Sequence, residues 1–277
     1  MRLGLKVNQQ QLLWPELLDR VLLAEQLGFE NAWIFDHLEA LDGDPRGPCM
    51  EAWSLLSALA ARTERIRLGA LASAVTFRHP SVLTAQAVTV DRISGGRLDI
   101  ALGAGSHDGE HRKLGISFPA VRERTKQLEE AVQVLRLLMT EDEAHFQGRH
   151  FRLDGATHRP RPVQRPHPPI WIGAGGERRM IPLAARRADV WHCFAAIDEL
   201  PSRIRVFDEH VSRAGRSPSE VSKAANLTIS EPWTDVEARA STLRELGFDS
   251  LVVPWPPEGS ARVEEFAGTL MPGLLLA

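Results

Sequence analysis

Residues 169–176 read Pro-Ile-Trp-Ile-Gly-Ala-Gly-Gly, an apolar run that ends in glycines, and the segment from Glu177 to Arg187 follows with apolar residues at helical spacing. A short apolar run, a glycine turn and a helix in this order form one βα unit. The same alternation of short apolar runs and longer helical patterns recurs along the chain, which is typical of a parallel sheet flanked by helices.

Eight short runs have the length and composition of strands. They are Arg2–Val7, Asn31–His37, Ile66–Ser73, Leu98–Gly105, Pro169–Ala174, Val190–Phe194, Lys223–Ser230 and Ser250–Trp255. A chain of 277 residues is close to the ~250 residues of a (β/α)8 barrel. We therefore predict an α/β fold of the TIM-barrel type, with an open doubly wound sheet as the alternative.

Two segments interrupt the alternation of strands and helices. Residues 38–50 form a loop rich in glycine and proline, and residues 144–168 contain a small hairpin around Phe146–Phe151 followed by a stretch of arginine and proline. Both fit as insertions between βα units, and no linker separates the chain into parts. The sequence thus predicts one TIM-barrel domain over residues 1–277.

The net charge and the cysteine content argue against several classes of function. The formal net charge is −3, which gives no electrostatic reason to expect nucleic acid or an anionic membrane as a partner. The two cysteines, Cys49 and Cys193, lie far apart, as in proteins of a reducing compartment. We expect a cytoplasmic enzyme with a small-molecule substrate, and a homodimer if an apolar face of the barrel is exposed.

Polar residues at the ends of the predicted strands are the candidates for chemistry, because the active sites of such barrels lie at the carboxyl ends of their strands. Asp36 and His37 follow an apolar strand, and histidine exchanges protons near neutral pH. The functional interpretation is a proton donor or acceptor, His37, beside a carboxylate, Asp36. The plain alternative is a helix cap or a salt bridge in a loop.

The glycine-rich turn at residues 173–176 is a candidate anion site. Glycines let backbone amides approach a phosphate, and a following helix adds a favourable dipole. A tight turn without a ligand is the alternative. A second strand-end turn, Gly103-Ala104-Gly105, precedes Ser106. Neither turn has the spacing of a dinucleotide-binding fingerprint.

Residues His107-Asp108-Gly109-Glu110-His111 spell an H-x-x-E-H pattern that occurs in zinc peptidases. Zinc binding needs both histidines on one face of a stable helix, but here a glycine interrupts the motif and no third ligand is evident. We therefore expect no metal site.

With these features placed, the sequence resembles the bacterial luciferase-like superfamily, most closely its deazaflavin (F420)-dependent oxidoreductases. The resemblance covers nearly the whole chain up to about Phe194 and weakens after it. It rests on several short segments in the right order: Ala24–Phe29, Asp36-His37, Glu51–Trp53, Thr63–Gly69, Phe77–Pro80, Ile93–Leu98, Leu102–Gly105 and Pro168–Gly176.

The resemblance implies roles for particular residues. Asp36 and His37 match an Asp-His pair at the deazaflavin ring, where the histidine is often the catalytic acid or base. Leu71 and Ala72 match a non-prolyl cis peptide behind the ring. The expected cofactor-binding residues are Leu71, Ala72, Gly105, Ser106, Gly173, Ala174, Gly175, Gly176 and Glu177, with the stretch 173–176 holding the cofactor phosphate.

The leading hypothesis is therefore an F420-dependent oxidoreductase that transfers hydride between the deazaflavin and a small organic substrate. One alternative is an FMN-dependent monooxygenase fed by a separate reductase. Another is a catalytically silent protein that binds a flavin or deazaflavin.

Overall fold

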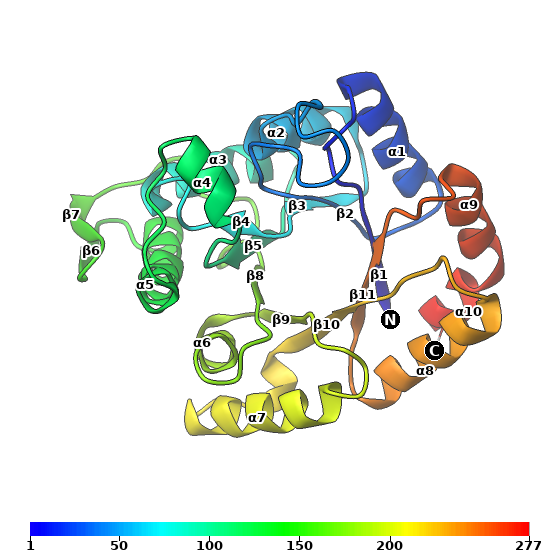
Figure 1. The fold of residues 1–277 in the computed structure, drawn as a ribbon. Coiled ribbons are helices and arrows are strands. Elements are labelled where there is room, and N and C mark those ends of the chain that lie inside the picture. Colours follow the sequence, from blue (N-terminus) through cyan, green and yellow to red (C-terminus); the bar gives the residue numbers. More distant parts are fainter. Residues whose placement is uncertain (277) are drawn as a thin grey trace.

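Eight parallel strands close into a barrel in the computed structural model, which describes residues 1–276. The hydrogen-bonded order is β3-β2-β1-β11-β10-β9-β8-β5-β4, and a parallel bridge between Leu68 and Leu98 joins the two ends of this sheet. Helices surround the strands (Figure 1). The TIM-barrel prediction is confirmed, and the open doubly wound alternative is wrong.

Each of the eight expected strands is present, with ends that lie within a few residues of the predicted ones. The barrel strands are β1 (Arg2–Lys6), β2 (Asn31–Ile34), β3 (Arg67–Ala70), β5 (Ile100–Gly103), β8 (Ile170–Gly173), β9 (Val190–Cys193), β10 (Ser222–Asn226) and β11 (Ser250–Pro254). A two-residue strand, β4 (Ser73–Ala74), pairs with the end of β5.

Helices alternate with the strands along the chain, as the sequence predicts. They are α1 (Trp14–Gln26), α2 (Ala52–Arg62), α3 (Pro80–Ile93), α4 (Asp108–Lys113), α5 (Val121–Thr140), α6 (Met180–Arg187), α7 (Leu200–Arg213), α8 (Trp233–Glu245), α9 (Ser260–Thr269) and α10 (Met271–Leu276), with a 3-10 turn at Pro218–Glu220. Helix α6 begins at Met180, so the prediction that it starts at Glu177 is wrong: residues 177–179 form a turn.

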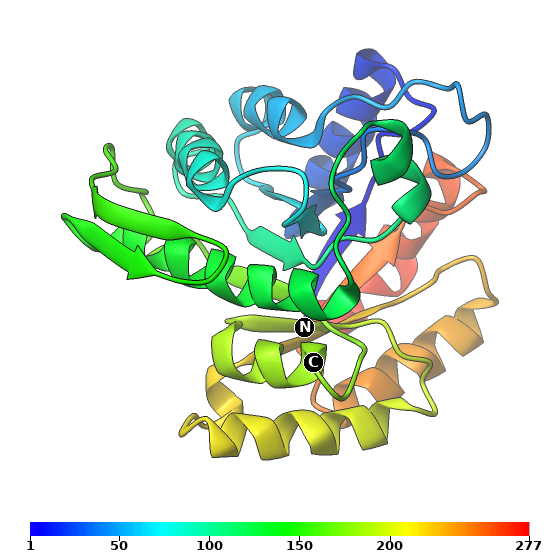
Figure 2. The same cartoon turned by 60° about the vertical axis from the view of Figure 1, so that its left-hand side comes forward.

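Both predicted insertions are present. Residues 38–50 form a loop without helix or strand. Strands β6 (Ala144–Gln147) and β7 (Arg152–Ala156) pair as an antiparallel hairpin that lies beside α5, outside the barrel (Figure 2). Neither insertion disturbs the order of the barrel strands.

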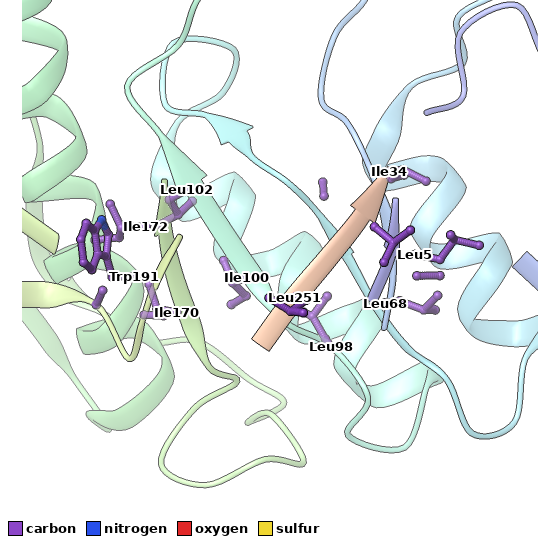
Figure 3. Packing of buried hydrophobic residues seen from close by; sticks show 14 of the residues in the cluster. Leu5, Ile34, Leu68, Leu98, Ile100, Leu102, Ile170, Ile172, Trp191 and Leu251 are labelled. Atoms are coloured by element: carbon purple, nitrogen blue, oxygen red, sulfur yellow. The ribbon is translucent and has the colours of Figure 1, made fainter. Parts of the chain in front are cut away.

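Apolar side chains fill two layers. In the outer layer, alternate strand residues such as Leu5, Ile100 and Ile172 pack against the helices (Figure 3). In the inner layer, Trp33 and Trp171 meet edge to face inside the barrel with ring centroids 4.7 Å apart. This alternation follows from the two-residue period of a strand.

The seam between β3 and β5 carries an ion pair as well as backbone bonds. Arg67 donates two hydrogen bonds to the Asp99 carboxylate, at 2.8 and 2.9 Å, and Asp99 also accepts one from the Asn31 amide at 2.5 Å. Asp99 is buried, so its charge needs these partners. Three neighbouring strands are therefore tied together where the barrel closes. Within the described chain, no helix combines the length and the apolar character needed to cross a bilayer.

The inner tryptophans require glycine opposite them, and we expect Gly69→Ala to destabilise the fold. A Cβ at Gly69 would lie 2.3 Å from Trp33 Cζ3 and 2.7 Å from the Asp99 carbonyl oxygen. Overpacking of this kind costs about 1–3 kcal/mol of unfolding free energy, which urea denaturation measures.

Gly268→Ala in α9 is the matched control, because a Cβ there meets nothing within 4 Å. It should stabilise the protein by ~0.5–1 kcal/mol, the usual gain inside a helix. Equal stability of Gly69→Ala and the wild type would contradict the packing described here.

Candidate active site

A cleft of about 260 Å³ opens at the carboxyl ends of the barrel strands. Seven of the candidate residues from the sequence line it: Asp36, His37, Leu71, Ala72, Gly105, Ser106 and Gly173. They come from four different βα units, and the parallel register brings their strand ends to one mouth of the barrel. Lys6, Ala74, Gly103, Ala104 and Phe194 complete the lining.

The other four candidates, Ala174, Gly175, Gly176 and Glu177, lie in the turn that leaves β8 and do not line the cleft. Within the described chain, the backbone amides of residues 175–179 donate no hydrogen bond. A Cβ built at Gly175 or Gly176 would meet nothing within 4 Å. These glycines are therefore not needed for packing, and their bare amides are free to bind an anion.

Two arginines add positive charge to this turn. Arg178 and Arg179 are exposed and line a neighbouring cleft of about 240 Å³ between α5 and α6. Arg122 and Lys126 from α5 face the same cleft. A phosphate at the glycine turn would thus lie beside several cations.

Asp36 is buried and its carboxylate binds Arg78. The two guanidinium nitrogens of Arg78 donate to its two oxygens at 2.5 and 3.0 Å, and the Ala74 amide donates to it at 3.1 Å. A second carboxylate, Glu51, accepts from the same guanidinium at 3.0 Å. The Asp36 carboxylate therefore pairs with a cation and connects the segment after β2 to β4 and to Arg78.

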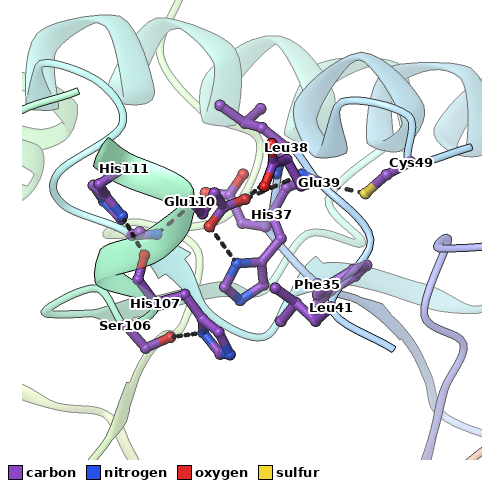
Figure 4. Close-up of polar contacts among 12 residues, drawn as sticks. Phe35, His37, Leu38, Glu39, Leu41, Cys49, Ser106, His107, Glu110 and His111 are labelled. Atoms are coloured by element: carbon purple, nitrogen blue, oxygen red, sulfur yellow. Dashed lines mark hydrogen bonds and ion pairs between the residues drawn. The ribbon is translucent and has the colours of Figure 1, made fainter. Parts of the chain in front are cut away.

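His37 is held by a different carboxylate, Glu110 of α4 (Figure 4). The distance from His37 Nδ1 to Glu110 Oε2 is 2.8 Å, and Glu110 Oε1 accepts from the backbone amides of Leu38 and Glu39 at 2.6 and 3.2 Å. Glu110 thus fixes both the loop after β2 and the imidazole ring. Because Nδ1 is the donor to this carboxylate, Nε2 is the ring atom left for a ligand.

The side chains of the zinc-type pattern around Glu110 have other partners. His111 is buried, with Nε2 at 2.7 Å from Thr76 Oγ1 and Nδ1 at 3.0 Å from the His107 carbonyl oxygen. Across the residues that the structure describes, no three His, Cys, Asp or Glu side chains are placed to hold a metal ion. Glu110 serves His37 instead.

Another histidine at this end of the barrel, His192, is buried. Burial lowers the pKa of His192 to about 3, with a smaller contribution from the nearby charge of Lys6, so its ring is neutral. The Asn226 side chain holds its Nε2 at 3.0 Å. His37, in contrast, lines the cleft.

Sequence reasoning missed four residues of the site: Lys6, Arg78, Glu110 and Phe194. Arg78 lies in one of the segments that carry the family resemblance, which was a usable signal. Glu110 lies within the zinc-type pattern of residues 107–111, and nothing in that pattern predicts its contact with His37. The peptide bond between Leu71 and Ala72 is cis, as the resemblance implies.

A family model and curated relatives both match most of this chain. The family model described as luciferase-like monooxygenase matches residues 2–263, so the resemblance continues well beyond Phe194. An F420-dependent glucose-6-phosphate dehydrogenase of Microbacterium testaceum is 32% identical over 234 residues, which cover 83% of this chain and 68% of the relative. An F420-dependent hydroxymycolic acid dehydrogenase of Mycobacterium tuberculosis is 27% identical over 256 residues, 92% of this chain and 70% of that protein.

Solved structures with the same fold include two F420-dependent enzymes. A secondary alcohol dehydrogenase in complex with an F420-acetone adduct superposes with a TM-score of 0.86 at 19% identity, over 98% of both chains. A tetrahydromethanopterin reductase from Methanopyrus kandleri gives 0.83 at 18% identity, over 99% of both chains. These identities are low, so the two structures bear on the fold alone.

The buried pair between Asp36 and Arg78 leads to a stability prediction. Arg78→Met leaves the Asp36 charge buried without its cation and should lower the unfolding free energy by about 3–5 kcal/mol. The double variant Asp36→Asn/Arg78→Met removes both charges and should lose less than the single variant. Urea denaturation of the three proteins measures these differences.

Arg213→Met serves as the control, since its partner Glu209 is exposed and such pairs contribute about 0–1 kcal/mol. An Arg78→Met protein no less stable than this control would show that Asp36 does not depend on Arg78.

Proposed function

Because this chain belongs to the luciferase-like monooxygenase family, we propose that it transfers a hydride between F420 and a small organic substrate at the cleft lined by His37. It is an F420-dependent oxidoreductase, like the dehydrogenases to which it is about 30% identical. Bound F420 supplies the redox chemistry by accepting or donating a hydride. The observation that carries the proposal is the cleft that joins His37 to the end of β8, directly before the bare amides of residues 175–179.

The glycine turn suits the phosphate group of the cofactor. Backbone amides without partners bind phosphate oxygens, and a turn without side chains at Gly175 and Gly176 lets the anion approach closely. Arg178 and Arg179 add positive charge next to this turn. We assign phosphate binding to the backbone of residues 175–177.

The cleft itself suits the flat ring. Small residues contribute to its lining, among them Ala74 of β4, Gly103 of β5 and the following Ala104, so a planar group has room to enter. Leu71 and Ala72 line the cleft from the segment between β3 and β4. The cofactor-binding role of these residues is part of the proposal.

His37 is the proton-exchanging residue in this proposal. Glu110 holds the proton at Nδ1, which leaves Nε2 to take the hydroxyl proton of an alcohol substrate or to return a proton to a carbonyl. Asp36 does not contact this ring in the hydrogen-bond pattern; it fixes the adjoining backbone through Arg78. Its role in catalysis is therefore positioning.

The direct test is a titration of the purified protein with F420 and with FMN, followed by fluorescence quenching. The proposal expects saturable binding of F420 and weaker binding of FMN, and turnover of reduced or oxidised F420 with small alcohols or carbonyl compounds. Binding of FMN alone, with oxygen consumption from its reduced form, would favour a monooxygenase. Tight F420 binding without turnover, unchanged by His37→Ala, would favour a silent binding protein.

We expect His37→Ala to lower turnover by about 10²–10⁴, the usual contribution of a general acid or base, while the dissociation constant for F420 changes little. Steady-state kinetics with F420 absorbance as the readout measures the first quantity, and quenching measures the second. His150→Ala is the control, because His150 lies outside the cleft, next to β7. Equal losses in both variants would remove His37 from the mechanism.

Gly175→Val should have the opposite effect. A Cβ at this position meets no protein atom within 4 Å, so the unfolding free energy should stay near the wild-type value, whereas the side chain should block access to the backbone amides. We expect the affinity for F420 to fall at least tenfold, and by much less for the deazaflavin ring compound that lacks the phosphate. Wild-type affinity for F420 would place the phosphate elsewhere.

A further inference from the structure

Lys6 is a cation that lines the cleft, and it has no role in the proposed hydride transfer. It is the last residue of β1, two positions after Gly4, which faces Trp33 inside the barrel, and one after Leu5, which packs outward. Since side chains alternate along a strand, Lys6 points to the interior at the barrel mouth. It lines the cleft together with His37 and also lines a second cleft beside Trp255.

No described residue neutralises this ammonium. The Lys6 ammonium donates no hydrogen bond and forms no ion pair within residues 1–276, although 27 ion pairs occur elsewhere in that part of the chain. Asp36 and Glu51 share the guanidinium of Arg78, and Glu110 accepts hydrogen bonds from His37 and two backbone amides, so each carboxylate has its own partners. Asp42 lines the second cleft but accepts from Gln10 instead.

The remaining groups around Lys6 do not compensate its charge either. His192 on β9 is neutral, and its Nδ1 is buried without a partner. Arg20, across the second cleft, is itself a cation stacked on the Trp255 ring at 4.4 Å. An ammonium that is partly removed from water without a counter-charge is unfavourable, and burial indeed lowers the pKa of Lys6. A ligand with negative charge would relieve this cost.

We propose that Lys6 binds the negatively charged form of the deazaflavin ring in the cleft. This inference rests on the proposed function, since it takes the cleft to be the ring site. A deazaflavin carries an acidic ring hydroxyl, and its anion is delocalised over the ring system. An uncompensated cation in the same small cleft stabilises that anion wherever the charge is spread, because the Coulomb interaction falls off only slowly with distance.

The sign of the effect follows from linkage. A cation nearby favours the charged form of an acid, so the ring hydroxyl should have a lower pKa in the bound cofactor than in free solution. In return, the bound anion should raise the pKa of Lys6 from its lowered value, since the coupling between two sites is mutual. Lys6 would then tune the electron distribution of the cofactor, which is the usual contribution of a protein charge near such a ring.

The experiment compares the wild type with Lys6→Met and Lys6→Arg, each saturated with F420, by recording absorbance against pH. The anionic ring absorbs at longer wavelength than the neutral ring, so the midpoint reports the pKa of the bound hydroxyl without any turnover. We expect Lys6→Met to raise that midpoint by about one to three units, and Lys6→Arg to leave it near the wild-type value. Lys113→Met is the matched control: Lys113 is exposed on α4 and pairs with Glu39 at 2.9 Å.

Thermal unfolding without cofactor gives an independent readout. Removal of a buried charge that has no partner should leave the unfolding temperature of Lys6→Met equal to or above that of the wild type, whereas a lysine with a structural partner would lower it when removed. Should the methionine variant fail to fold, Lys6→Gln replaces it in the same titration.

The outcomes separate this inference from the proposed function. A wild-type protein that does not bind F420 overturns the function itself. If the wild type binds F420 and Lys6→Met titrates at the same midpoint, the function stands and the role of Lys6 is refuted. A raised midpoint in Lys6→Met, with none in Lys113→Met, supports it.

Discussion

The close contact of Trp33 with Trp171 inside the barrel is the constraint on which the rest of the structure depends. Two indole rings 4.7 Å apart fill the centre of the cylinder, and they fit only because Gly4 and Gly69 carry no side chain opposite Trp33. The inward-facing positions next to the tryptophans, among them Lys6 on β1 and Gly173 on β8, line the cleft at the mouth of the barrel.

The carboxylates at this mouth all have hydrogen-bond partners. Asp36 and Glu51 share the guanidinium of Arg78, Glu110 binds His37, and Asp36 and Glu110 also accept backbone amides of the loops they hold. These buried contacts fix the loops after β2 and β4, so the His37 ring is held in place before any ligand arrives. Within the described chain, the Lys6 ammonium has no partner, and the backbone amides of residues 175–179 donate no hydrogen bond. Both features would favour the binding of an anionic cofactor.

The sequence predicted the barrel well, because each strand is a short apolar run between helical patterns and no other closed arrangement accommodates eight such units. Strand β4, helix α4 and helix α10 escaped notice, since elements of two to six residues carry no periodic signal. The same limit hid the partner of His37. Asp36 is adjacent in sequence, but successive strand-end residues point to opposite sides, and the carboxylate that reaches the ring is Glu110, 73 residues away. The sequence could not single out Lys6, because only the structure shows that its ammonium has no partner.

The central claim is that one mouth of the barrel holds both the ring and the phosphate of the cofactor. A crystal structure of the protein in complex with F420 tests it most directly. The account predicts the ring in the cleft beside His37 and Ala72, with phosphate oxygens within hydrogen-bond distance of the backbone amides of Gly175 and Gly176. A cofactor bound at the opposite end of the barrel, or a phosphate that does not touch this turn, would contradict it.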